Sequence, residues 1–96
     1  MATLDDKHRT DLLNRLKRAE GQLRGIQRMI ESGEPCMQIA TQMAAVRKAL
    51  ESTYVRMTVC YMEQQLQACH GADRENHPED MKTVLEDVES LLGKLR

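Results

Sequence analysis

Three cysteines carry most of the chemistry that this 96-residue sequence can perform. Cys36 follows a Gly-Glu-Pro break at residues 33–35, and Cys60 lies 24 residues further along what is predicted to be one helix. Because a helix rises about 1.5 Å per residue, the two sulfurs of one chain lie roughly 36 Å apart. That separation excludes a disulfide, whose Cα atoms lie within about 7 Å of each other, and it excludes a shared metal ion. Any chemical partner of Cys36 must therefore come from a second subunit.

Cys60 has both a functional and a structural interpretation. If Cys36 and Cys60 meet across an interface, their thiolates can bind Cu(I), recruit Zn(II) with further ligands, or close a disulfide or polysulfide bridge. Alternatively, Cys60 is a small buried apolar residue, as free cysteines often are. The odd number of cysteines favours thiol chemistry or metal ligation over structural disulfides.

A second group of candidate ligands lies near the end of the long helix. Cys69 and His70 are adjacent in the sequence, and His77 follows after a short polar segment. Sulfur and imidazole groups of this kind can bind zinc or nickel. The alternative is an exposed loop without a ligand role.

Three helices are predicted to position these residues, over about 5–32, 35–69 and 78–95, so the expected fold class is all-α. The first and third helices each carry an apolar stripe at steps of three and four residues. The second is apolar on more than one side, which is typical of a central helix packed by several neighbours. Gly33 suits the left-handed position after a helix, and Pro35 suits the first turn of the next. Residues 1–96 are predicted to form a single domain.

The length of the second helix predicts an oligomer. At about 50 Å the helix is too long for a compact chain of this size, whose radius of gyration is about 13 Å, so it must protrude or pair. The chain also lacks Trp and Phe, and such a small core gains much from oligomerisation. If the helix pairs antiparallel with its own copy about residue 48, Cys36 lies opposite Tyr61, with Cys60 beside it and Gln65 one turn further. An isologous dimer contains two such sites.

Charge is distributed unevenly, although the net charge is only −1. Residues 1–30 carry seven basic against four acidic residues, whereas residues 62–96 carry four basic against eight acidic residues. The N-terminal third can therefore form a local positive surface, or simply a solvated helix face. The sequence has no run of 18 apolar residues and no N-terminal signal pattern, which predicts a cytoplasmic protein without a membrane partner.

A set of short motifs runs through the first two predicted helices. Its members are Asn14-Arg15-Leu16-Lys17, Gly21-Gln22-Leu23, Gly25-Ile26, Arg28-Met29, Cys36 and Gln42-Met43-Ala44-Ala45-Val46-Arg47. In these motifs the chain resembles the CsoR/RcnR/FrmR family of small all-helical bacterial repressors. The resemblance covers about residues 5–65, and the third helix fits it in character. It implies a dimer of dimers that binds operator DNA without a helix-turn-helix, and that releases DNA when an effector reaches a cysteine-centred intersubunit site.

The chain departs from the family at the effector site. Copper-sensing members carry His 25 positions after the first cysteine and Cys 29 positions after it, where this chain has Tyr61 and Gln65. Nickel- and cobalt-sensing members carry His at both positions, formaldehyde-sensing members keep the first His, and persulfide-sensing members keep the cysteine pair. Neither Tyr nor Gln is a good ligand for soft or borderline metals. Only Cys36 carries over directly, and Cys60 is the candidate that compensates.

The resemblance also assigns a DNA surface. Basic and polar residues of the first helix and of the centre of the second are expected to contact phosphates, which makes binding steeply dependent on salt. These residues are Arg15, Lys17, Arg18, Gln22, Arg47 and Lys48. Because no recognition helix is evident, specificity is expected to depend substantially on DNA shape.

The expected function is therefore a transcriptional repressor and not an enzyme, because the sequence has no Ser-His-Asp order, no glycine-rich phosphate loop and no paired acids in a pocket. The favoured effector is a metal ion, namely Cu(I), Zn(II), Ni(II) or Co(II). Modification of the Cys36 thiol by a reactive sulfur species or an aldehyde comes next. The alternative function is a cytoplasmic metal or sulfur carrier that does not bind DNA.

Overall fold

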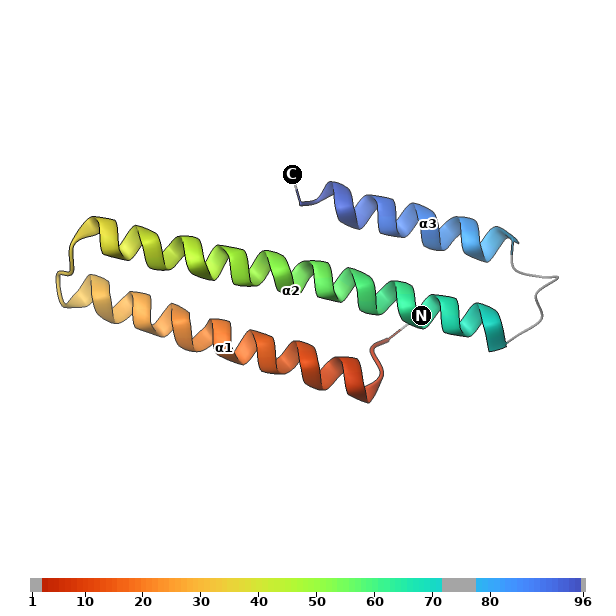
Figure 1. Ribbon diagram of the computed structural model, residues 1–96, viewed down its shortest axis with the longest axis horizontal. Helices are drawn as coiled ribbons and strands as arrows, with labels where there is room; N and C mark the ends of the chain where they lie inside the picture. Colours follow the sequence, from red (N-terminus) through yellow and green to blue (C-terminus); the bar gives the residue numbers. More distant parts are fainter. Residues whose placement is uncertain (1–2, 72–77, 96) are drawn as a thin grey trace.

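The computed structural model describes residues 3–71 and 78–95, and in these ranges the chain forms three helices and no strand. The helices are α1 (Asp6–Glu31), α2 (Cys36–Gly71) and α3 (Pro78–Gly93). Figure 1 shows α1 and α2 side by side as a long hairpin, with α3 along the C-terminal half of α2. The all-α prediction is confirmed. The third helix starts at residue 78 as predicted, and the other helix ends differ from the predicted ones by one or two residues, as assigned helix ends commonly do.

Local sequence signals set both ends of α1. The Asp5 side chain caps the first turn by accepting a hydrogen bond from the backbone N–H of His8 at 2.9 Å. At the other end Gly33 has φ 72°, and the backbone N–H of Glu34 donates to the carbonyl of Met29 at 3.0 Å. This is the pattern of a glycine-terminated helix, in which the left-handed residue reverses the chain. α2 can therefore begin at Cys36 and run back along α1.

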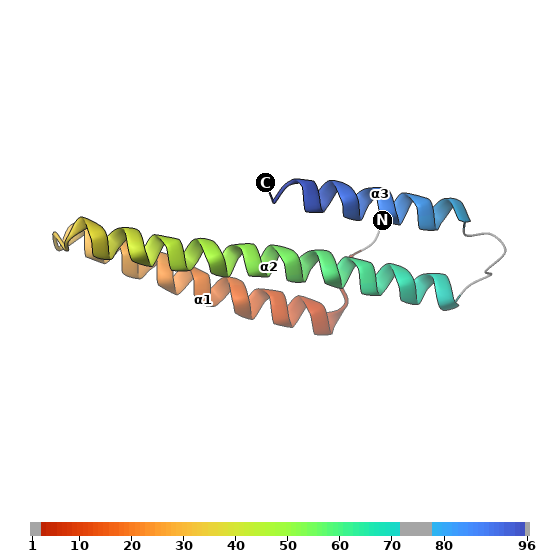
Figure 2. The same ribbon diagram turned by 45° about the horizontal axis from the view of Figure 1, so that its top comes forward.

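Most of the core lies in the hairpin, between α1 and α2. Its deeply buried apolar residues come from both helices and recur at helical spacing on α1. They are Leu12, Ala19, Ile26, Val46 and Cys60, and two valines of α3, Val84 and Val88, are buried as well. The two tyrosine hydroxyls fasten α3 to α2, because Tyr54 donates to the carbonyl of Leu91 at 2.5 Å and Tyr61 donates to the Asp87 carboxylate at 2.8 Å. Both α1 and α3 contact α2, and Figures 1 and 2 show them along different sides of this central helix.

The chain is elongated. Its principal extents are 62 × 28 × 15 Å and its radius of gyration is 18.2 Å, well above the ~13 Å of a compact domain of this size. The prediction that the second helix is too long for a compact chain is confirmed. One broad surface of the hairpin also remains apolar and uncovered, and Leu16, Leu23, Met43 and Leu50 on it are each 40–49% exposed.

Candidate effector site and DNA-binding surface

Cys36 occupies the first position of α2 and is exposed. Tyr61 and Gln65 follow it by 25 and 29 residues on the same helix. At about 100° per residue both lie within roughly 20° of the Cys36 direction. The three residues therefore share one stripe of α2, although the length of the helix separates Cys36 from the other two.

Tyr61 already has a partner within its own chain. Its hydroxyl donates to Oδ2 of Asp87 on α3 at 2.8 Å. This hydrogen bond is the main reason that the pKa of Tyr61 is raised, and desolvation and the negative charge of Asp87 act in the same direction. The phenol is therefore neutral at neutral pH, and it is a poor metal ligand as long as it contacts Asp87.

Cys60 lies on another side of α2. It follows Cys36 by 24 residues, which places it about 120° from the Cys36 stripe. It is 0% exposed and belongs to the hairpin core, near Arg56, Asp11 and Glu63. Burial raises the pKa of the Cys60 thiol, and the nearby acidic residues add to this effect against the opposing charge of Arg56. A protonated, enclosed thiol is a weak nucleophile and a weak ligand.

The buried Cys60 thiol is expected to make the fold sensitive to alkaline pH. Folded Cys60 keeps its proton at pH values at which the unfolded chain has released it, so the free energy of unfolding falls as pH rises above about 8.5. One such group contributes at most about 1.4 kcal/mol per pH unit. Urea unfolding between pH 7 and 10 should give a flatter slope for Cys60→Ala than for the wild type. Cys36→Ala is the control and should keep the wild-type slope; equal slopes for Cys60→Ala and wild type would show that Cys60 is not the responsible group.

The second group of candidate ligands is only partly described. Cys69 and His70 fall in the last turn of α2, but their side-chain surroundings lie outside the described residues, as does all of His77. Within residues 3–71 and 78–95, the described side chains form no cluster of three or more His, Cys, Asp or Glu suited to a metal ion. The ligand role of this group stays a prediction.

His8 is a buried polar residue that the sequence motifs did not single out. It is 6% exposed, with Nε2 3.0 Å from the Glu63 carboxylate and Nδ1 2.9 Å from the Asp5 carboxylate. The Oε1 of Gln64 accepts from the backbone N–H of Asp5 at 3.0 Å, so the start of α1 is tied to α2 one turn beyond Cys60. Because 55 residues separate His8 from Glu63, no local sequence signal could have indicated this contact.

The predicted DNA-binding residues divide between two sides of the hairpin. Arg15 donates from Nε to Oδ1 of Asp11 at 3.2 Å, and Arg56 donates from Nε to Oδ2 of the same carboxylate at 3.2 Å. Arg47 precedes Arg56 by nine residues, about half a turn around α2, so it points away from Arg15. Arg18, Gln22 and Lys48 are exposed, as is Lys17. A single chain therefore does not bring all six residues onto one surface.

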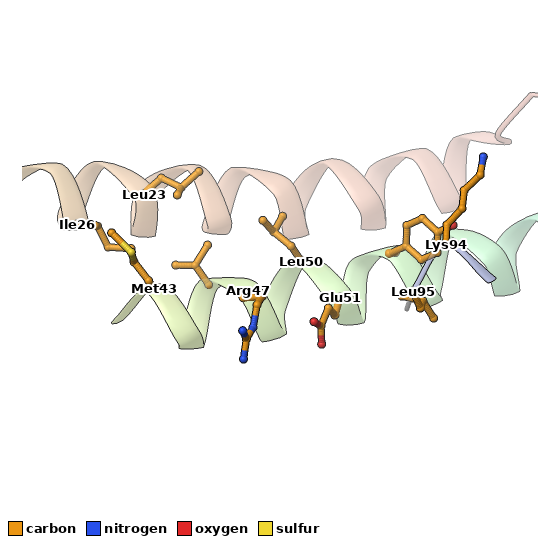
Figure 3. Close-up of a pocket in the computed structure, with 10 residues that line it drawn as sticks. Leu23, Ile26, Met43, Arg47, Leu50, Glu51, Lys94 and Leu95 are labelled. Carbon is orange, nitrogen blue, oxygen red and sulfur yellow. The ribbon is translucent and has the colours of Figure 1, made fainter. Parts of the chain in front are cut away.

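Arg47 instead borders an apolar groove where the three helices meet. The groove has a volume of about 480 Å³, and Leu23, Met43 and Leu50 line it together with Lys94 and Leu95. Figure 3 shows side chains from α1 and α2 facing each other across it. A second groove of about 360 Å³ begins at Leu50 and Tyr54 and continues along α1 past Leu12, Leu13 and Leu16. The two grooves together form what we call the apolar face of the hairpin.

Comparison with known proteins identifies the family. Residues 8–94 match the family described as metal-sensitive transcriptional repressor. This chain belongs to that family. The match extends over all three helices, so it includes Cys36, Tyr61, Asp87 and the Asp11–Arg15 pair.

Several relatives of this repressor family are named as copper sensors. The chain is 41% identical over 51 residues to the copper-sensing transcriptional repressor CsoR of Bacillus subtilis (strain 168), covering 53% of this chain and 50% of that protein. It is 49% identical over 43 residues to the copper-sensing transcriptional repressor RicR of Mycobacterium tuberculosis (strain ATCC 25618 / H37Rv), covering 45% of each chain. The chain thus spans about half the length of these curated relatives.

Solved structures of two regulators have the same fold. The nickel-responsive transcriptional regulator InrS superimposes with a TM-score of 0.72 at 23% identity, over 100% of this chain and 99% of that one. A variant of the formaldehyde-responsive regulator FrmR from Salmonella enterica serovar Typhimurium gives a TM-score of 0.70 at 29% identity, over 94% and 96%. The predicted membership of the CsoR/RcnR/FrmR family is confirmed, and its members are transcriptional repressors and not enzymes.

The names of these similar proteins mention different effectors, namely copper, nickel and formaldehyde. None of the helices in the described ranges is long and apolar enough to cross a lipid bilayer.

Proposed function

We propose that this chain is a repressor that binds operator DNA as a dimer of dimers and is released when an effector acts on Cys36. The observation that carries the proposal is the exposed Cys36 at one end of a 36-residue helix that has its stripe partners, Tyr61 and Gln65, at the other end. An antiparallel copy of α2 would bring the partner's Tyr61 and the partner's Gln65 to Cys36. The site would then be complete only between subunits.

The apolar face supports pairing. Leu16, Leu23, Met43 and Leu50 leave two adjoining apolar grooves uncovered in the single chain. Complete burial of a large apolar side chain is worth roughly 1.5–3 kcal/mol. Because these four side chains are 40–49% exposed, covering them would gain about half of that for each. Because the face contains parts of both α1 and α2, a second hairpin laid on it would form a four-helix arrangement with α2 in the centre.

The residues around Cys36 fit a metal ion poorly, although metal sensing is the rule in this family. To serve as ligands, Tyr61 would have to leave Asp87 and Cys60 would have to leave the hairpin core. Gln65 offers only a neutral amide, which soft and borderline metals bind weakly. A covalent change at the exposed Cys36 thiol requires none of these rearrangements. The contacts therefore favour thiol modification, by reactive sulfur or an aldehyde, over coordination of Cu(I), Zn(II), Ni(II) or Co(II).

DNA binding by the reduced, metal-free protein is the direct test. Fluorescence anisotropy with a labelled duplex from upstream of its own operon should give saturable binding. The logarithm of the affinity should fall linearly with that of salt, because Arg15 and the neighbouring basic side chains would displace counterions from phosphates. A duplex of equal length and shuffled sequence is the control and should bind more weakly. Binding of metal or sulfur without any DNA binding would instead identify a carrier.

A further inference from the structure

One carboxylate, that of Asp11, holds two arginines from two different helices. Arg15 of α1 donates from Nε to Oδ1, and Arg56 of α2 donates from Nε to Oδ2, both at 3.2 Å. All three side chains are about one third exposed, at 34% for Arg15, 39% for Arg56 and 36% for Asp11. The cluster therefore lies at a solvent-accessible edge of the hairpin, where α1 contacts α2.

The contact with Asp11 leaves Arg15 with further N–H donors that can bind an anion. A guanidinium has five N–H donors in a rigid plane, and the Nε contact with Asp11 occupies only one of them. The terminal nitrogens, which match the two oxygens of a phosphate, stay available. Two arginines against one carboxylate also give the cluster a net charge of +1, so Asp11 orients Arg15 without cancelling its attraction to DNA.

The pair Glu20–Arg24 shows what is particular about Asp11. Glu20 and Arg24 have the same i, i+4 spacing on α1 and a contact of 2.9 Å, but both side chains are 65% exposed and the contact stays within one helix. Such a surface pair restrains its arginine weakly. Asp11 differs because Arg56 holds its second oxygen from across the hairpin. Because Arg56 restrains the Asp11 carboxylate, the position of Arg15 depends on how α1 packs against α2.

We propose that Asp11 and Arg56 are positioning residues that fix Arg15 for contact with the operator phosphate backbone. The inference rests on the proposed DNA-binding function and adds two residues to it that the motifs did not contain. It also gives α2 a physical connection to the DNA surface, because Arg56 lies one turn before Cys60 and Tyr61 on that helix. A shift of α2 against α1 would move Arg56, and with it the carboxylate that holds Arg15.

The test compares Asp11→Asn with Glu20→Gln. Each substitution removes one negative charge from α1, so simple electrostatics predicts equal or tighter DNA binding for both. If Asp11 positions Arg15, Asp11→Asn should weaken operator binding about three- to tenfold, because the amide replaces one of the two accepting oxygens with an NH2 donor. Its binding to the shuffled duplex should stay equal or increase, because a loosely held Arg15 still attracts phosphates but no longer matches the backbone shape of the operator. The ratio of operator to shuffled affinity should therefore fall. Glu20→Gln should keep the wild-type ratio.

A double-mutant cycle separates positioning from a general loss of structure. In an Arg15→Ala background, Asp11→Asn should have little further effect on operator binding, since it acts through Arg15. Arg56→Lys keeps the charge but loses the Nε contact with Asp11, so it should also lower the ratio of operator to shuffled affinity. It serves in place of Asp11→Asn if that variant does not fold. Equal ratios for Asp11→Asn, Arg56→Lys and Glu20→Gln, or additive effects with Arg15→Ala, would overturn the inference while leaving the repressor function intact. A wild-type protein that binds no operator would overturn both.

Discussion

Leu50→Glu is expected to convert the protein into a folded monomer that no longer binds operator DNA. Leu50 lines both grooves of the apolar face, and it is 40% exposed in the single chain. In a symmetric dimer the substitution removes two buried leucines and places two carboxylates in their position. Each lost leucine costs the dimer about 1 kcal/mol, because only the exposed 40% of the side chain is covered on pairing, and each buried unpaired charge costs several kcal/mol more. The dimer dissociation constant should therefore rise at least about a thousandfold.

Val55→Glu is the matched control for this experiment. Val55 is 42% exposed, close to the value for Leu50, but it lies about 140° away around α2 and borders neither groove. Sedimentation velocity at micromolar concentration should show monomers for Leu50→Glu and at least dimers for Val55→Glu, while circular dichroism should show that both keep their helices. Dimers in Leu50→Glu, or equal dissociation of both variants, would mean that the apolar face is not the pairing surface.

The helices were predictable because their signals are local. The apolar stripe of α1 repeats at steps of three and four residues, and the Gly33–Pro35 break spans three residues. In the structure α1 ends just before this break and α2 begins just after it. The long α2 could even be recognised as unfit for a compact chain from its length alone. These features can be predicted without knowing which helices contact each other.

The site was only half predictable, because its other half depends on contacts between distant residues. Helical geometry alone places Tyr61 and Gln65 on the Cys36 stripe and Cys60 off it. It does not reveal that Cys60 is buried near Asp11, or that Tyr61 donates a hydrogen bond to Asp87, 26 residues away.

The DNA surface has the same limitation. Arg56 was not among the predicted contacts, since nothing in its sequence neighbourhood shows that it shares Asp11 with Arg15 across 45 residues. The basic residues could be found by composition and by the family motif. Their arrangement requires the docking of α1 on α2, which places Arg15 beside Arg56 and turns Arg47 toward the apolar groove.

Cys36→Ala is expected to abolish the effector response while leaving operator binding by the untreated protein unchanged. Cys36 is exposed at the start of α2 and is not part of the hairpin core, so its thiol can be removed without disturbing the helices. Allosteric coupling of about 1–3 kcal/mol would weaken operator binding roughly 5- to 150-fold on effector addition in the wild type. The same treatment should leave the affinity of Cys36→Ala within about twofold. The panel to be titrated is Cu(I), Zn(II), Ni(II), Co(II), tetrasulfide and formaldehyde.

Cys60→Ala decides whether the second cysteine takes part. Because Cys60 is 0% exposed and its thiol has a raised pKa, Cys60→Ala should respond to the active effector as the wild type does. A lost response in Cys60→Ala, with its helices intact, would mean that the hairpin opens to bring Cys60 to the partner's Cys36. Mass spectrometry of the treated protein then separates the effector classes. A covalent adduct on the peptide that contains Cys36 indicates thiol modification, whereas an unmodified peptide together with stoichiometric bound metal indicates coordination.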